Sequence, residues 1–367
     1  MTDAPASVRP YKSGRFYTLE KTGTGFAIAA RMRDQWSYRQ QHQRVFVSTA
    51  ARLHLGFLDI SGALGRRFGS LGLSINAFRT SLHMQIAPTV SASGPSAERA
   101  VGYATEMLGL LGIREGVEIG IDEAIPDHAG LGSGTQMALA VGHAIHLLFG
   151  LSTNTSQVAI QMQRGRRSGI GIGGFDHGGF MVDSGVSEQD GPPPLTVQMP
   201  FPEAWRVLLV MDRGGQGLHG QQEVEAFRRL PPFPADQAAH LCHLTLMQIL
   251  PGIREQRLGP VAAGIAELQR SVGDHFAPAQ GGRYTSPAVA DLLNWAESQG
   301  YAGVGQSSWG PTGFILLPDH ASAIQLKEQA RQRVGEFSPL CFEIAAACNE
   351  GSHVAIESTR PVTKEAR

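Results

Sequence analysis

The first half of the chain carries two hydrophobic periods. Apolar residues at alternate positions predict strands at 45–47, 52–59, 70–75, 81–86 and 116–121. Apolar residues that recur every three to four positions predict helices at 97–111, 137–148 and 155–166. Strands that are interleaved with helices in this way predict an α+β layer.

An acidic, proline-rich segment at 188–194 predicts a surface hairpin or a domain boundary, because proline cannot donate to a β-ladder. Beyond it, apolar runs predict strands at 205–211, 314–317 and 341–347. Helical periodicity predicts helices at 234–250, 260–272, 286–298 and 321–335. The chain therefore reads as a two-domain α+β protein: an extension at 1–43 that we expect to be partly mobile, domains at 44–190 and 191–358, and a tail at 359–367.

Amino-acid composition excludes several classes of binding partner. Lys and Arg total 31 against 32 acidic residues, so no overall charge attracts nucleic acid or an anionic membrane, and any anion site must be local. No apolar run approaches the length of a membrane span. The three cysteines lack a CxxC spacing, which argues against a disulfide framework and a structural zinc site. We expect a cytoplasmic protein that acts on small molecules.

The strongest local signal is the segment 126–136, Pro-Asp-His-Ala-Gly-Leu-Gly-Ser-Gly-Thr-Gln, which runs into an apolar helix. Glycines at alternate positions let the backbone curl around a ligand, and the free N–H groups at a helix start favour an anion. A phosphate is the expected guest. The alternative is an ordinary helix entry that Ser133 or Thr135 caps. The residues assigned to this cradle are Gly130, Gly132, Ser133, Gly134, Thr135 and Gln136.

Three further groups of residues have the chemistry of a binding site. Arg164, Arg166 and Arg167 precede Ser168 and can hold phosphate, although basic residues at a helix end can equally be solvated. Arg52 and His54 alternate on one strand and therefore share a face, but scaffolding roles fit them as well. Gln306, Ser307 and Ser308 offer neutral donors on a loop, where turn chemistry is the competing explanation.

The cradle resembles the phosphate-binding motif of the GHMP kinase superfamily, Gly-Leu-Gly-Ser-Ser followed by small residues. Together with 52–59, Arg-Leu-His-Leu-Gly-Phe-Leu-Asp, and 305–312, Gly-Gln-Ser-Ser-Trp-Gly-Pro-Thr, it is similar to one branch, the β-ribofuranosylaminobenzene 5′-phosphate synthases. The cradle has Gly-Thr-Gln at 134–136 where kinases usually carry Ser-Ala-Ala. The resemblance covers roughly residues 44–358.

This resemblance implies a fold and a reaction. The fold has an N-terminal domain with a left-handed βαβ element and a ferredoxin-like C-terminal domain. The reaction condenses phosphoribosyl pyrophosphate with 4-aminobenzoate or 4-hydroxybenzoate, releases CO2 and pyrophosphate, and opens methanopterin biosynthesis. It uses Mg²⁺ and no organic cofactor, and a homodimer is the common assembly.

The resemblance also suggests site roles. Asp176 aligns with the aspartate that activates a hydroxyl in several kinases, and in a synthase it would coordinate Mg²⁺ or stabilise positive charge at the ribose. Its competing role is to shape a glycine-rich turn. The expected catalytic residues are Asp176, Arg167 and His54, with Arg52, Arg164, Ser168, Gln306, Ser307, Ser308 and the cradle binding substrate.

Two other functions stay open from the sequence. An ATP-dependent small-molecule kinase would use Asp176 as a general base, although the Gly-Thr-Gln of the cradle departs from the kinase pattern. A non-catalytic ligand-binding protein could retain the same fold, because fold alone does not determine activity.

Overall fold

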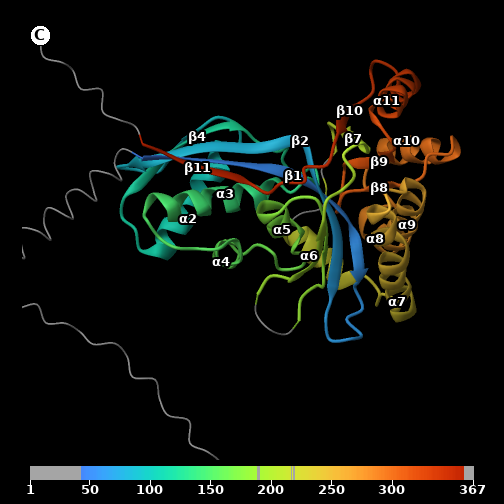
Figure 1. Cartoon of the computed structure of the whole chain (residues 1–367), viewed down its shortest axis with the longest axis horizontal. Helices are drawn as coiled ribbons and strands as arrows, with labels where there is room; N and C mark the ends of the chain where they lie inside the picture. Colours follow the sequence, from blue (N-terminus) through green and yellow to red (C-terminus); the bar gives the residue numbers. More distant parts are fainter. Residues whose placement is uncertain (1–42, 188–190, 216, 218–219, 359–367) are drawn as a thin grey trace, which may run out of the picture. The chain divides into compact units, whose positions relative to one another are not determined.

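Two long antiparallel strands, β1 (Gln43–Asp59) and β2 (Phe68–Ala87), form the centre of the first sheet (Figure 1). The computed structural model describes residues 43–187, 191–215, 217 and 220–358. The predicted break between strands at 70–75 and 81–86 is wrong, because β2 continues through it. Register shifts from Ala50 opposite Arg79 to Ala51 opposite Ile75, so residues 76–78 bulge out while the pairing continues.

The first sheet has strand order β11-β1-β2-β4-β3, with β5 paired to β2 and β6 paired to β5. All neighbours are antiparallel except β3 and β4, which are parallel and are connected through helix α2. The remaining strands are β3 (Ser91–Ser93), β4 (Gly116–Glu123), β5 (Phe180–Asp183), β6 (Leu195–Met199) and β11 (His353–Ser358). Strands β6 and β11 follow residue 190 in the chain but pair within this first sheet.

Helices cover one face of this sheet (Figure 1). They are α2 (Ala97–Leu111), α3 (Ser133–Leu148), α4 (Thr155–Gln161) and α5 (Ile170–Asp176). Helix α4 is shorter than the sequence predicts, because Gln163 and Gly165 take left-handed backbone conformations, with φ of 54° and 76°. Helix α5 is glycine-rich because it packs closely: a Cβ on Gly174 would lie 2.9 Å from Ser74 Oγ.

The second sheet is antiparallel with order β10-β7-β9-β8. Its strands are β7 (Arg206–Asp212), β8 (Val304–Gln306), β9 (Gly313–Leu317) and β10 (Leu340–Ala345). Helices α10 (Pro287–Ser298) and α11 (His320–Val334) pack against it. The fold is thus the expected two-domain α+β type.

Three helices and a π-helical turn form a layer beside the second half of β1 (Figure 1). They are α7 (Ala235–Leu244), the π-helical turn (Thr245–Ile249), α8 (Leu250–Arg254) and α9 (Leu258–Gln280). Helix α6 (Gly220–Arg229) contacts this region through Phe227, whose ring packs edge-on against Phe57 and Phe276. Gly56 permits the contact of β1 with α9, because a Cβ there would lie 2.2 Å from Leu268 Cδ2. Within the described ranges, no helix is long and apolar enough to span a membrane.

Strand β1 contributes to both main hydrophobic cores. Its first half places Val45 and Val47 in the core under α2 and α3. Its second half places Leu53 and Leu55, both fully buried, in the core that α7 and α9 complete. The transition between the two halves therefore lies between Val47 and Ala51, just before Arg52, where the candidate site begins.

Candidate active site

The glycine-rich segment after β4 forms the cradle that the sequence predicts. Gly130 and Gly132 have φ of 77° and 89°, conformations that glycine adopts without strain. Helix α3 begins four residues earlier than its apolar pattern, at Ser133, with Gly132 as a cap that has no side chain. Ser133, Gly134 and Thr135 therefore form the first helical turn, where the helix dipole favours an anion.

The three sequence blocks that carry the family resemblance meet at this cradle. The carbonyl oxygen of Gly130 accepts hydrogen bonds from Arg52 Nη1 at 2.8 Å and from Ser307 Oγ at 2.7 Å. Ser307 Oγ in turn accepts from the backbone N–H of His54 at 3.0 Å. The backbone N–H of Arg52 donates to Leu131 O at 3.1 Å. We call this network of β1, the cradle and the 306–312 loop the clasp.

A cavity of about 360 Å³, which we call the cradle cavity, adjoins the clasp. Three arginines, one carboxylate and two aromatic rings contribute side chains to it. Its lining comprises Arg52, Arg99, Tyr103, His128, Gly130, Gly132, Ser133, Gly134, Thr135, Arg164, Gly217, Gly220, Glu223, Ser308, Trp309 and Gly310. A site of this charge at a helix N-terminus is suited to a polyanionic ligand.

Arg52 lines the cavity with a guanidinium group in a buried setting. Burial lowers the pKa of its guanidinium to about 10, although nearby Glu223 acts in the opposite direction. It therefore stays cationic at neutral pH, and its Nε is buried without a hydrogen-bond partner among the described residues. A cation with little solvent gains more from an anionic ligand than an exposed one does.

The other two arginines also lie near the start of α3. One comes from a segment that precedes α3 in the sequence, and the other from a segment that follows it. Arg99 of α2 pairs with Asp127 and donates to Ser133 Oγ at 3.3 Å. Arg164 lies over the ring of Tyr103, 5.1 Å from its centroid, and donates to the Tyr103 hydroxyl at 2.5 Å. These contacts orient both guanidinium groups near the cradle.

Glu223 of α6 is the cavity's carboxylate among the described residues. Its Oε2 lies 2.6 Å from Arg167 Nη2, and its Oε1 accepts from Trp309 Nε1 at 3.0 Å. Burial raises the pKa of Glu223, and the neighbouring Arg167 opposes that shift. Arg167 also lies over the Phe227 ring, 5.2 Å from its centroid. Arg167 thus reaches the cavity through Glu223.

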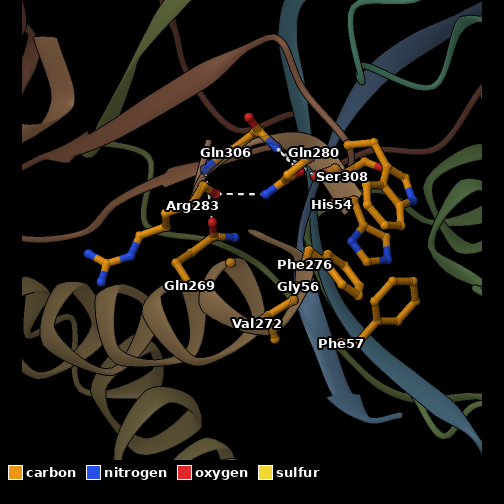
Figure 2. Close-up of a pocket in the computed structure, with 12 residues that line it drawn as sticks. His54, Gly56, Phe57, Gln269, Val272, Phe276, Gln280, Arg283, Gln306 and Ser308 are labelled. Atoms are coloured by element: carbon orange, nitrogen blue, oxygen red, sulfur yellow. Dashed lines mark hydrogen bonds between the residues drawn. The ribbon is translucent and has the colours of Figure 1, made fainter. Parts of the chain in front are cut away.

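A second, smaller cavity adjoins the first. Its volume is about 20 Å³, which is room for about one water molecule. Figure 2 shows His54, Phe57 and Phe276 along one side of it. Ser308 and Trp309 line both cavities, and Trp309 stacks on Phe276 with a centroid distance of 4.3 Å. An aromatic wall therefore separates the two spaces.

His54 is neutral in this setting. Burial lowers the pKa of its imidazole to about 3, and Arg52 contributes in the same direction. The ring lies edge-on to Phe57 at 4.6 Å, and its Nε2 has no hydrogen-bond partner among the described residues. At neutral pH the group therefore cannot act as a cationic acid.

The low pKa of His54 predicts a loss of stability in acid. Between pH 3 and 6.5 the unfolded state binds the proton and the folded state does not, so stability falls as pH drops below 6.5. At about pH 5 this amounts to about 2 kcal/mol of unfolding free energy. Urea denaturation at neutral pH and at about pH 5 should show wild type losing that much more than His54→Asn. Other titrating groups are common to both proteins, so equal losses would contradict the prediction.

Two predicted site residues, Gln136 and Ser168, lie outside the cavity lining and hold neighbouring segments in place. Gln136 is fully buried, accepts from Thr49 Oγ1 at 2.6 Å and donates to Gly171 O at 2.8 Å. Ser168 donates to the buried carboxylate of Asp183 at 3.1 Å. Neither residue lines the cradle cavity. Their contacts fix α3 and the segment before α5 in place, and a direct role with substrate stays a prediction.

The three predicted loop donors, Gln306, Ser307 and Ser308, have different positions relative to the two cavities. Ser307 is fully buried within the clasp. The Gln306 side chain accepts from the backbone N–H of Thr285 at 2.7 Å and lines the smaller cavity. Ser308 has a φ of 55° and donates its backbone N–H to His54 O at 3.1 Å. Of the three, Ser308 is the one that reaches the cradle cavity.

Asp176, the predicted metal ligand, is exposed at the end of α5 and accepts a hydrogen bond from Thr155. It does not line the cradle cavity. In the described part of the chain no group of three His, Cys, Asp or Glu side chains could hold a metal ion. The cavity offers Glu223, which Arg167 already engages. This donor set does not fit a Mg²⁺ ion held by protein ligands, because Mg²⁺ requires an octahedron of oxygens.

The sequence analysis did not assign eight residues of the lining. Three are the glycines Gly217, Gly220 and Gly310, and the other five are Arg99, Tyr103, His128, Glu223 and Trp309. Arg99 and Tyr103 share a face of α2 at a spacing of four, a signal that cannot be told from a solvated helix face without the fold. Trp309 does stand within the 305–312 block. Glu223 follows the glycine-rich segment at 214–220, which the sequence predicts to be a loop leading into a helix, as a lid over the site or as a simple connection, without assigning Glu223 to the site.

Family comparisons agree with this architecture. The model for the GHMP kinases N terminal domain matches residues 96–182, and the model for the GHMP kinases C terminal region matches residues 249–336. Among solved structures, Lactococcus lactis galactokinase complexed with galactose superposes with a TM-score of 0.61 at 16% identity, covering 89% of this chain and 99% of that one. Mevalonate diphosphate decarboxylase from Staphylococcus aureus gives 0.58 at 14% identity, covering 85% and 98%. At these identities the likeness shows the fold.

Sequence relatives are more specific. A protein of Archaeoglobus fulgidus named beta-ribofuranosylphenol 5'-phosphate synthase is 32% identical over 291 residues, which is 76% of this chain and 89% of the relative. A protein of the same name from Methanocaldococcus jannaschii is 30% identical over 302 residues, which is 74% of this chain and 89% of the relative. The chain therefore belongs to the β-ribofuranosylphenol 5′-phosphate synthase family, pentosyltransferases built on the GHMP kinase fold.

Proposed function

We propose that this protein transfers the phosphoribosyl group of phosphoribosyl pyrophosphate to a para-substituted benzoate with loss of CO2. The bond between ribose C1 and the diphosphate oxygen breaks, and its electrons leave with pyrophosphate. The ring carbon that bears the carboxylate attacks C1, and the bond to the carboxylate then breaks to return its electrons to the ring. CO2, pyrophosphate and the ribosylated arene are the products, and no proton is gained or lost.

The observation that carries this proposal is the convergence of the three family blocks on a cationic cavity at a helix N-terminus. Arg52, Arg99 and Arg164 surround the first turn of α3. A donor with a diphosphate and a 5′-phosphate presents several negative charges, and preorganised guanidinium and N–H groups stabilise the charge that grows on the leaving group.

The aromatic lining supports an aromatic acceptor. Trp309 and Tyr103 both contribute to the cradle cavity, and Trp309 is braced by Phe276 behind it. Offset or edge-on ring contacts of this kind favour a bound arene. The name of the relatives gives a phenol product, so we propose 4-hydroxybenzoate and 4-aminobenzoate as the two acceptors to compare.

The residues of the site mainly position the reactants and exclude water. The attack requires no general base, because the ring carbon bears a carboxylate instead of a proton. His54 is neutral and buried, so it adds no charge beside the donor. Fixed geometry and a dry site are effective contributions to such a reaction, since the cationic ribose would otherwise react with water.

Finer features of the proposal follow the family resemblance. Mg²⁺ is proposed to accompany the donor through the oxygens of its own diphosphate. We also propose a place at the start of methanopterin biosynthesis, a cytoplasmic location and a homodimeric assembly.

Purified protein tests the function directly. With phosphoribosyl pyrophosphate, Mg²⁺ and carboxyl-labelled 4-hydroxybenzoate or 4-aminobenzoate, we expect CO2 and pyrophosphate in equal amounts, with faster turnover for one acceptor. Assays that omit the acceptor or the donor serve as controls. Absence of both products with either acceptor would refute the proposal, and formation of ADP from ATP with a hydroxylated metabolite would support a kinase instead.

A further inference from the structure

Glu223 has a position that anion binding alone does not explain. Its side chain is 20% exposed and lies in a cavity that otherwise collects positive charge. A carboxylate close to a substrate phosphate would oppose binding of the donor by charge repulsion. A cavity built solely to hold a polyanion would exclude such a group.

The contacts of Glu223 fix its charge in place. Arg167 donates to Oε2, and Trp309 donates to Oε1. Each carboxylate oxygen can accept more than one hydrogen bond, so both retain capacity toward the cavity. Helix α6 is held by a second set of contacts, because Phe227 packs edge-on against Trp309 and Phe276 at 5.4 and 5.6 Å. The carboxylate is therefore not needed simply to anchor the helix.

The proposed reaction creates one positive charge, on the ribose ring. As the diphosphate leaves, C1 and the ring oxygen share that charge until the acceptor carbon bonds to C1. An anion that faces this centre stabilises the transition state and repels the anionic donor in the ground state. These are the two effects expected from a fixed carboxylate in a cationic cavity.

We propose that Glu223 is a catalytic residue that faces the ribose and stabilises its developing positive charge, at the expense of donor affinity. This inference rests on the proposed function. Arg167 then acts as a positioning residue, because it orients the carboxylate from outside the cavity lining. No covalent bond to Glu223 and no proton transfer are involved.

The test is Glu223→Gln, which keeps an oxygen to accept from Trp309 but removes the charge. We expect kcat to fall about 100-fold and KM for phosphoribosyl pyrophosphate to fall severalfold, because ground-state repulsion is relieved. Direct calorimetric titration with the donor should show tighter binding. Glu223→Asp keeps the charge and should recover part of kcat.

A matched control lies on the same helix. Glu225 pairs with Arg228 and Arg229 on the exposed face, so Glu225→Gln should leave kcat and KM within about twofold. Thermal unfolding of each variant separates folding defects from catalysis, and Glu223→Ala, which also removes the charge, serves if the glutamine variant does not fold.

The outcomes separate the two proposals. An inactive wild type refutes the proposed function. An active wild type with a Glu223→Gln variant that keeps its kcat, or that loses donor affinity, overturns the catalytic role. With either of these results for an active wild type, the role left for Glu223 would be to orient Arg167 and α6. If the glutamine variant does not fold, a Glu223→Ala variant that keeps the kcat of wild type would likewise overturn the catalytic role.

Discussion

Arg52→Ala is expected to reduce kcat/KM for phosphoribosyl pyrophosphate about a thousandfold, the effect of removing a preorganised cation that meets charge on the leaving group. The guanidinium is buried beside the first turn of α3 and holds the Gly130 carbonyl at 2.8 Å. Its removal therefore takes away a ligand for the anion and also loosens the cradle. Steady-state kinetics with varied donor concentration provide the measurement.

The size of the loss depends on geometry as well as charge. Arg52→Lys retains a cation but lacks the planar fork, so we expect an intermediate loss of about 10- to 100-fold. Arg44→Ala, on the same strand, removes an arginine that contacts Gln85 outside the cavity. That control should keep its kinetic constants within about twofold. Equal activity of Arg52→Ala and Arg44→Ala would show that Arg52 does not bind the donor.

Gly130→Ala is expected to abolish most activity and to lower the unfolding free energy by about 3 kcal/mol. A Cβ at this position would lie 2.4 Å from Ser307 O and 3.0 Å from Gly310 O, both backbone atoms. The φ of 77° adds strain for any residue other than glycine. The cradle and the 306–312 loop must then separate, which breaks the clasp. Urea denaturation and kcat/KM measure the two effects.

Gly102 provides a control for adding a methyl group. It lies within α2, and a Cβ there meets no heavy atom within 4 Å. Gly102→Ala should therefore be neutral or slightly stabilising, since alanine favours helix by about 1 kcal/mol over glycine. A Gly130→Ala variant as stable and active as Gly102→Ala would mean that the close approach of the cradle to the loop is unimportant.

Much of the fold follows from local patterns. Helix α2 has the bounds that its apolar period predicts, and β7 lies within one residue of its prediction. The failures arise where tertiary contacts override local signals. The break predicted within β2 is absent because β1 pairs with it on both sides of the bulge at 76–78. Strand β11 is short, and its alternating Val354 and Ile356 are both exposed, so its place in the sheet comes from pairing with β1.

The sequence predicts which motifs form the site, but it does not predict which individual side chains line the cavity. Repeated glycines mark the cradle because backbone that approaches a ligand needs them, and that physical requirement is local. Which polar side chains reach the cavity depends on where distant helices pack. Arg99 and Glu223 arrive from α2 and α6, while Asp176 lies outside the lining although it stands in a conspicuous glycine-rich segment.

Because strand β1 packs in both main cores, the two regions of the protein cannot be separated from one another. Val45 belongs to one core and Leu53 to the other, while Arg52 and His54 on the same strand contribute to the clasp. A fragment ending near residue 190 would therefore leave half of β1 without its packing partners, and a fragment starting there would lack the strand altogether. Although two family models describe the two regions, neither region is a separable module. Recombination between relatives should succeed only when the strand, the cradle and the 306–312 loop are inherited together.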